Sequence, residues 1–329
     1  MRVLVTGASG LIGMHATEAL RAMGTDPIVF DTQPFTPPGG AAPGGCLVVP
    51  GDVTDRGAVL AVLRDFGIDR IVHLAAVLQR SAQDDPLRAA EVNIRGSLNV
   101  LDAARTLGIR RVVVASSIAV YGPARYDPID EQHPCSPTTV YGAGKLFVEH
   151  SGHVFRKLHG LEFVALRYGA TFGPGPRQAT SAGAATELRS FFEDAVRAGA
   201  VSLWGPEAAR PLVYVKDAAL ATALACLVDP APASSVFNVA GSRAASMAEC
   251  ADVLGRLLPG LRVVRRDGTG MTPPMPATLA IDRAAAELGY QPRYPLADAI
   301  TDYVAALRAG AAGANRGRVT ADAPSVDSR

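Results

Sequence analysis

The stretch Val5–Gly13, VTGASGLIG, decides the fold of this 329-residue chain. It places Gly7, Gly10 and Gly13 in a TGxxGxxG spacing, directly after an apolar run and at the start of a helical pattern. Such glycines allow a tight turn and a close backbone approach to a pyrophosphate, and the following helix N-terminus offers free N–H groups. We therefore predict a strand–loop–helix unit that binds a dinucleotide through Gly7, Ser9, Gly10, Leu11, Ile12 and Gly13.

Beyond this unit, short apolar runs alternate with helical patterns through the first half of the chain. The runs are continuous in Val, Ile and Leu rather than alternating, which is typical of strands buried on both faces of a parallel sheet. Repeated strand–helix–strand units predict an α/β fold with a doubly wound, Rossmann-type parallel sheet. The expected strands are 2–6, 27–31, 46–50, 69–75, 111–117 and 162–168, with helices near 11–23, 55–66, 86–107 and 138–159.

The composition changes after Tyr168, where a Gly-, Ala-, Pro- and Thr-rich loop leads to a helix expected near 186–198. Short strands are expected at VSLW, PLVYV and VFNVA, and helices are expected to begin at Lys216, Ser246 and Pro295. The predicted domains are a dinucleotide-binding domain over 1–168, to which segments near 211–240 return, a smaller C-terminal substrate-binding lobe over 169–210 and 241–309, and a disordered tail over 310–329.

The overall composition excludes several classes of protein. Hydrophobic residues make up 48% and charged residues 19% of the chain, as in compact globular proteins. The net charge is +1 with no basic stripe, so we expect no nucleic-acid partner. The four cysteines match no zinc spacing and fit reduced thiols in a cytosolic protein. Since neither a signal peptide nor a long apolar run is present, we expect a cytoplasmic protein without a membrane span.

Asp31 ends the second predicted strand, in the context DTQPF. A carboxylate at this place can bind both ribose hydroxyls of an adenosine and repels a 2′-phosphate. No arginine follows it directly to accept such a phosphate. The cofactor is therefore predicted to be NAD rather than NADP.

Tyr141 and Lys145 lie four residues apart in SPTTVYGAGKLFVEH, so they share one face of the predicted helix. A nearby ammonium favours the phenolate, and a tyrosine so placed can take a proton from a substrate hydroxyl while hydride leaves the same carbon. Gly142 and Gly144 each cost the helix about 1 kcal/mol relative to alanine. We expect them to allow the close approach of a cofactor, a substrate or a neighbouring helix.

Together with TGxxGxxG and Asp31, further motifs carry a resemblance to a known family. They are GDV at 51–53, HLAA at 73–76, Asn93, SSxxVYG at Ser116–Gly122 and YxxxK. The chain resembles the extended short-chain dehydrogenase/reductase family, in its NAD-dependent epimerase/dehydratase group, over about residues 1 to 308.

This resemblance implies roles for individual residues. Ser117 would hydrogen-bond the reacting oxygen, Tyr141 would be the acid/base, and Lys145 would bind the nicotinamide ribose and lower the pKa of the tyrosine. Asp52 and Val53 would lie at the adenine, Ala75 and Ala76 beside the ribose and phosphates, and Asn93 would support the active-site helix and its water network. Three further residues are expected at the cofactor: Leu74, Ser116 and Tyr168.

The residues expected at the substrate leave its identity open. Relatives that act on nucleotide sugars usually read RYFNVYGP, whereas this chain reads RYGATFGP, with Ala170 at the position of the asparagine. Glu187 stands near the place of a second asparagine, and both departures weaken the case for a nucleotide diphosphate. Arg210, in ARPLVYVKDAA, is a candidate ligand for a phosphate or a carboxylate. The other substrate candidates are Gln79, Arg80, Ser117 and Thr171.

The resemblance therefore leads to an NAD-dependent enzyme with more than one candidate reaction. The main interpretation is an epimerase-like cycle that oxidises a sugar-type substrate transiently and reduces it again. The first alternative is net dehydrogenation of a small hydroxy acid, sugar acid or hydroxy amino acid held by Arg210, and the second is a non-catalytic NAD-binding sensor. A dehydratase is less favoured, since Ile118 and Ala119 stand where that branch carries an acidic residue. We expect no metal site, and a homodimer formed through the helices near 86–107 and 138–159.

Overall fold

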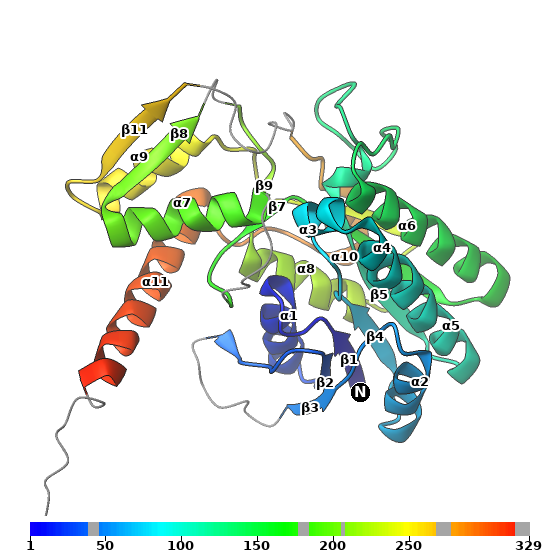
Figure 1. The fold of residues 1–329 in the computed structure, drawn as a ribbon. Coiled ribbons are helices and arrows are strands. Elements are labelled where there is room, and N and C mark those ends of the chain that lie inside the picture. Colours follow the sequence, from blue (N-terminus) through cyan, green and yellow to red (C-terminus); the bar gives the residue numbers. More distant parts are fainter. Residues whose placement is uncertain (39–45, 177–183, 205–207, 268–277, 320–329) are drawn as a thin grey trace, which may run out of the picture.

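The computed structural model describes residues 1–38, 46–176, 184–204, 208–267 and 278–319. A seven-stranded sheet runs through the centre of the molecule in the order β10-β6-β5-β4-β1-β2-β3, and neighbouring strands are parallel throughout (Figure 1). This topology confirms the predicted doubly wound, Rossmann-type sheet. Its strands are β1 (Arg2–Thr6), β2 (Asp26–Asp31), β3 (Leu47–Pro50), β4 (Arg70–His73), β5 (Arg111–Ser117), β6 (Glu162–Tyr168) and β10 (Val236–Val239).

Helices cover both faces of the sheet, and an apolar core lies on each face. Successive residues of a strand pack into the two cores in turn. Val3 and Val5 of β1 pack into one core with residues of α1, α8 and α10, while Leu4 packs into the other with residues of α2, α5 and α6. Burial on both faces explains why the strands read as continuous apolar runs. The helices are α1 (Leu11–Ala22), α8 (Val215–Leu227), α10 (Asp282–Leu288), α2 (Arg56–Asp65), α5 (Ser97–Leu107) and α6 (Val140–His159).

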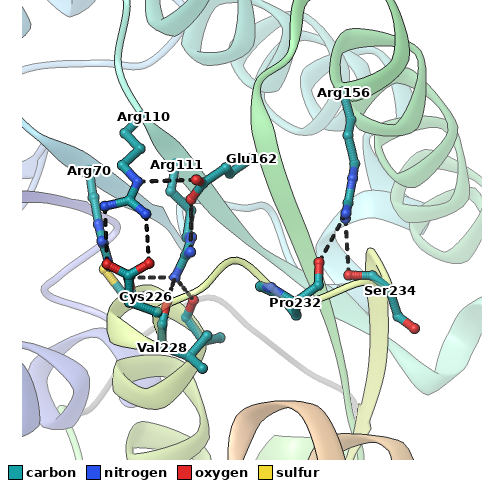
Figure 2. A network of polar contacts seen from close by, with 11 residues as sticks. Arg70, Arg110, Arg111, Arg156, Glu162, Cys226, Val228, Pro232 and Ser234 are labelled. Carbon is teal, nitrogen blue, oxygen red and sulfur yellow. Dashed lines mark hydrogen bonds and ion pairs between the residues drawn. The ribbon is translucent and has the colours of Figure 1, made fainter.

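Arginines anchor the amino-terminal edge of the sheet to the end of α8 (Figure 2). Arg70 of β4 donates to the carbonyl of Cys226, and the fully buried Arg111 of β5 donates to that carbonyl at 3.1 Å and to the carbonyl of Val228 at 2.6 Å. Glu162 of β6 accepts from Arg111 Nε at 2.8 Å. Cations at a helix C-terminus satisfy its last carbonyls and oppose its dipole. This edge is structural and leaves the opposite, carboxyl edge for the site.

Elements of the second part of the chain share a further apolar core. That core gathers Phe172, Leu188, Phe192, Leu203 and Tyr303, among others. Two small parallel sheets belong to this part, β7 with β9 and β8 with β11. Among the described strands after β6, β10 alone joins the main sheet. The elements are β7 (Ala170–Phe172), α7 (Ala184–Ala198), β8 (Ala200–Trp204), β9 (Leu212–Tyr214), α9 (Met247–Leu257), β11 (Arg262–Arg266) and α11 (Leu296–Val319).

The structure differs from the sequence-based expectations in several segments: β7 lies where a loop was expected, and β11 and α10 were not predicted. The helix expected over 86–107 consists of α4 (Pro86–Ala89), a π-helical segment Ala90–Gly96 and α5, preceded by a short helix α3 (Gln79–Asp84). Helix α11 continues to Val319, so the first part of the predicted disordered tail is helical, and 320–329 lies outside the described residues. In the described part of the chain, no helix combines the length and apolar character that crossing a membrane requires.

Candidate active site

The glycine loop between β1 and α1 has the geometry that a pyrophosphate needs. Gly7 has φ +68°, and a Cβ there would lie 2.4 Å from the backbone nitrogen of Ala75. A Cβ on Gly13 would lie 2.2 Å from the carbonyl oxygen of Gly7. Gly10 is the N-cap of α1 and supplies no side-chain cap, so the N–H groups of the first turn remain available to a ligand. The loop therefore fits the predicted dinucleotide.

Asp31 is fixed at the carboxyl end of β2, beside this loop. Its Oδ2 accepts a hydrogen bond from the N–H of Ser9 at 2.9 Å, and its Oδ1 accepts one from the N–H of Gln33 at 2.9 Å. The Ser9 hydroxyl donates to the carbonyl of Gln33 at 3.0 Å. These bonds hold a negative charge where the ribose of a bound adenosine would lie, which fits NAD and repels a 2′-phosphate.

The residues predicted at the adenine and along the cofactor lie on the same edge of the sheet. Asp52 accepts from the N–H of Thr54 at 2.9 Å and pairs with Arg88 at 3.4 Å, and Val53 is buried. Leu74, Ala75 and Ala76 follow β4 directly and are half-buried. This edge can therefore line the length of a dinucleotide.

Ser117, Tyr141 and Lys145 come together where β5 ends and α6 begins. Ser117 is the last residue of β5, and its side chain lies near enough to the Tyr141 hydroxyl to lower the pKa of the tyrosine. Tyr141 lies in the first turn of α6, which Thr139 caps by accepting from the N–H of Gly142 at 3.1 Å. The Lys145 ammonium lies 5.5 Å from the centre of the Tyr141 ring. The three side chains can thus act on one substrate oxygen.

Burial sets the proton affinities of these groups. It raises the pKa of Tyr141 to about 12, against the lowering effect of the Ser117 side chain. It lowers the pKa of Lys145 to about 8, against the raising effect of the Glu149 carboxylate. The sequence predicts that the lysine lowers the pKa of the tyrosine, but in the protein alone burial is the larger effect. The positive charge of an oxidised nicotinamide would add to Lys145 in favouring the phenolate.

Three predicted cofactor residues are engaged within the protein. Asn93, in the π-helical segment, accepts from the N–H of Val77 at 2.7 Å and donates to its carbonyl at 2.9 Å, so its amide holds the loop after β4. The Ser116 hydroxyl donates to Glu149, and the Tyr168 hydroxyl lies 2.6 Å from that of Thr222. These side chains therefore support the site from within through contacts to other parts of the protein.

A buried polar cluster beneath the site was not predicted. Glu149 binds Ser116 and Arg167, and the Arg167 guanidinium lies 4.7 Å from the centre of the Tyr121 ring. The Tyr121 hydroxyl in turn donates to Asn238 Oδ1 at 2.6 Å. The one signal in the sequence was the position of Glu149, one turn after Lys145 on the same helix face.

The predicted substrate residues come from two parts of the chain, Arg210 and Thr171 from the second part and Gln79 and Arg80 from α3. Arg210 and Glu187 form a long ion pair of 3.9 Å, both about one fifth exposed (20% and 22%). Thr171 donates to the carbonyl of Gly169 at 3.2 Å in the strand that follows β6. Gln79 is half-buried at the start of α3, and Arg80 is exposed and pairs with Asp84 at 3.3 Å. Arg210 is thus paired with the Glu187 carboxylate within the protein itself.

Comparisons with known proteins agree with this geometry. A family model, the NAD dependent epimerase/dehydratase family, matches residues 3–240. A UDP-glucose 4-epimerase of Lacticaseibacillus casei is 30% identical over 327 residues, which cover 92% of this chain and 95% of that protein. The structure of a Thermus thermophilus UDP-glucose 4-epimerase with NAD is 29% identical with a TM-score of 0.81, over 94% of this chain and 99% of that one. The UDP-glucose-4-epimerase of Stenotrophomonas maltophila, with bound NAD and formylated UDP-arabinopyranose, is 25% identical with a TM-score of 0.84, over 95% and 99%.

Proposed function

The chain belongs to the NAD-dependent epimerase/dehydratase family and is an NAD-dependent extended short-chain dehydrogenase/reductase, and from this premise we propose that it epimerises a nucleotide sugar. The observation that carries the proposal is the joining of Ser117, Tyr141 and Lys145 at the carboxyl edge of the sheet. That edge also holds the glycine loop and Asp31. The family match confirms the predicted use of NAD, and the relatives supply the substrate class.

The chain's own residues would manage the proton. Bound NAD would supply the hydride acceptor for the substrate carbon and, once reduced, the donor that returns the hydride. Tyr141, as phenolate, takes the proton from the hydroxyl on that carbon, which leaves a ketone, and gives the proton back when the carbonyl is reduced on its other face. Ser117 hydrogen-bonds the same oxygen, and the Lys145 ammonium stabilises the phenolate.

The surroundings of the site complete the proposal. We place the substrate between α3 and the lobe over 169–210 and 241–309, where Gln79 of α3 and Thr171 and Arg210 of the lobe would contact it. A stripe of exposed apolar side chains on α6, the α6 stripe, supports a homodimer: Val140, Phe147, Val154 and Leu158 are 38%, 43%, 48% and 67% exposed and share one helix face. The described cysteines are free thiols, which fits a cytoplasmic location.

A second candidate is net dehydrogenation of a small hydroxy acid, sugar acid or hydroxy amino acid. The observation that favours it is the ion pair between Arg210 and Glu187. Because the carboxylate partly compensates the guanidinium, this pair suits a singly charged group better than a diphosphate, which Glu187 would repel.

One experiment separates the two candidates. The purified protein is incubated with NAD and UDP-glucose or UDP-galactose, and with free uronic, aldonic and hydroxy amino acids, and followed by NMR and by NADH absorbance. A new epimer without accumulated NADH supports the epimerase, and NADH formed with a free acid establishes the dehydrogenase instead. Tyr141→Phe should abolish either signal, while Tyr126→Phe, at an exposed tyrosine, should leave it unchanged. Activity retained in Tyr141→Phe would overturn the assignment of the base.

A further inference from the structure

Glu149 joins three secondary structure elements directly beneath the candidate active site. Its carboxylate accepts a hydrogen bond from Ser116 of β5, the neighbour of Ser117. It also forms a two-point ion pair with Arg167 of β6, at 2.9 Å to Nε and 2.6 Å to Nη2. The side chains of Arg167 and Glu149 are 6% and 4% exposed. A carboxylate so enclosed and bonded to two partners is held in one position.

The same carboxylate lies one helical turn after Lys145, which is itself buried at 6% exposure. A buried ammonium is costly unless an opposite charge accompanies it. We propose that Glu149 is a positioning residue for the reaction: held by Ser116 and Arg167 one helical turn after Lys145, its carboxylate keeps the buried Lys145 ammonium charged beside Tyr141. It acts through Lys145 and does not touch the substrate.

The charges around Lys145 support this assignment. On α6 itself, the pKa of Tyr141 is raised to about 12, so the phenol carries no charge at neutral pH in the protein alone. Glu149 is the carboxylate whose charge raises the pKa of Lys145. From β4, His73 faces the site, and burial lowers its pKa to about 3, so it is neutral at working pH. From β6, Arg167 is already paired with Glu149. From β5 and the π-helical segment come Ser116, Ser117 and Asn93, which are uncharged.

The role has a consequence for catalysis. If Glu149 were neutral, burial would act on Lys145 unopposed, and the lysine would lose its proton at lower pH. A neutral amine no longer stabilises the Tyr141 phenolate. The alkaline limb of kcat/KM would then move to lower pH, and kcat would fall at neutral pH while NAD still occupied its loop.

The composition of the chain allows a direct test. The protein contains three lysines, Lys145, Lys157 and Lys216. In protein labelled with ¹³C at lysine Cε, each gives one side-chain NMR signal, so Lys145 can be titrated with the other two as internal references. This measurement needs no substrate, so it can fail independently of the proposed function. We expect a Lys145 midpoint near pH 8 in the unchanged protein, from its pKa of about 8.

In Glu149→Gln, which keeps the size of the side chain, the Lys145 midpoint should move to lower pH, and the references should not move. Ser116→Ala is the matched control, since it removes a hydrogen bond to the carboxylate but no charge. Glu149→Asp, which keeps the negative charge, should return the Lys145 midpoint most of the way to its value in the unchanged protein. An unchanged Lys145 midpoint in folded Glu149→Gln would overturn the proposal, as would an equal shift in Ser116→Ala.

A second variant keeps the test decisive if Glu149→Gln does not fold. Removing one partner of a buried ion pair leaves the other charge uncompensated, whereas replacing both by neutral groups of similar size is tolerated better. Glu149→Gln combined with Arg167→Met removes both charges. Because Glu149 is the carboxylate that acts on Lys145, the midpoint should again move to lower pH. A midpoint that stays near pH 8 in this folded double variant would overturn the proposal.

Discussion

Gly142 and Ala119 lie in direct backbone contact, since a Cβ on Gly142 would stand 2.4 Å from the carbonyl oxygen of Ala119. This contact lets the first turn of α6 rest on the short helical turn Ile118–Val120 that follows Ser117. It thereby sets how closely Tyr141 approaches Ser117. The helix accepts a glycine here because a neighbouring backbone, rather than a side chain, occupies the space.

The two glycines of α6 should respond in opposite ways to alanine. Gly142→Ala should lower the free energy of unfolding by about 1–3 kcal/mol through overpacking, and should reduce kcat. Gly144→Ala is the matched control, because its Cβ would meet only side-chain atoms of Ile94 and Asn93, at 3.8 and 3.9 Å. That change should be neutral or stabilise by up to about 1 kcal/mol. Urea unfolding and activity assays measure both, and equal losses in the two variants would contradict the explanation.

His73 should make the protein sensitive to acid. It is buried between Thr6 and Ser97, at 2.7 and 2.9 Å from their hydroxyls, and burial lowers its pKa from 6.5 to about 3. The stability it contributes is therefore complete above pH 6.5 and is lost as the pH falls toward 3. The slope from this one proton is about 1.4 kcal/mol per pH unit.

His73→Gln, which has no proton to gain in this range, should show a flatter fall of stability between pH 7 and pH 5. The exposed His153→Gln serves as control and should keep the original slope. Urea unfolding at several pH values gives the slopes. If His73→Gln and the unchanged protein lose stability in parallel, another group is responsible.

Asp31 should decide between the two nicotinamide cofactors. Its carboxylate is fixed by the N–H groups of Ser9 and Gln33, so it cannot turn away from a 2′-phosphate. Asp31→Ser should weaken NAD binding and narrow the preference for NAD over NADP by about tenfold or more, the scale of one charge-assisted contact. Calorimetry with each cofactor measures this preference. The control is Asp26→Ser, at the far end of β2, which should leave the preference for NAD over NADP unchanged. An unchanged preference in Asp31→Ser would show that its carboxylate plays no part in choosing the cofactor.

The α6 stripe should hold two copies of the chain together. A glutamate at Phe147, which is 43% exposed in the middle of the stripe, would place two charges in the interface of a symmetric pair. Light scattering after size exclusion should then show Phe147→Glu shifted from dimer to monomer. Val263→Glu, at an apolar residue of β11 with 47% exposure, is the control and should not change the mass. A dimer that persists in Phe147→Glu would place the interface elsewhere.

Much of this protein follows from local patterns in its sequence. The glycine spacing of Gly7, Gly10 and Gly13 and the apolar runs predict the strands and the loop, because backbone conformation and burial act over a few residues. The YxxxK spacing places Tyr141 and Lys145 on one face, because the helix repeats every 3.6 residues. The prediction of one helix over 86–107 was only partly right, because a π-helical segment, Ala90–Gly96, interrupts it where the chain packs against α6. Such a segment does not follow from local helix preference.

Only the tertiary structure shows what surrounds these groups. Glu149 meets Ser116, 33 residues away, and Tyr121 meets Asn238, 117 residues away, through side chains that no local pattern connects. Arg210 likewise forms an ion pair with Glu187, and this pairing changes which charged groups the arginine can bind. The hydrophobic periodicity of a sequence predicts which face of a helix or strand is buried, but it does not identify the residues that contact that face. The sequence by itself therefore determined the sheet and predicted the glycine loop and the pair Tyr141 and Lys145 as the site. The folded chain decided the charges around them, because electrostatic contacts depend on distance in space rather than along the chain.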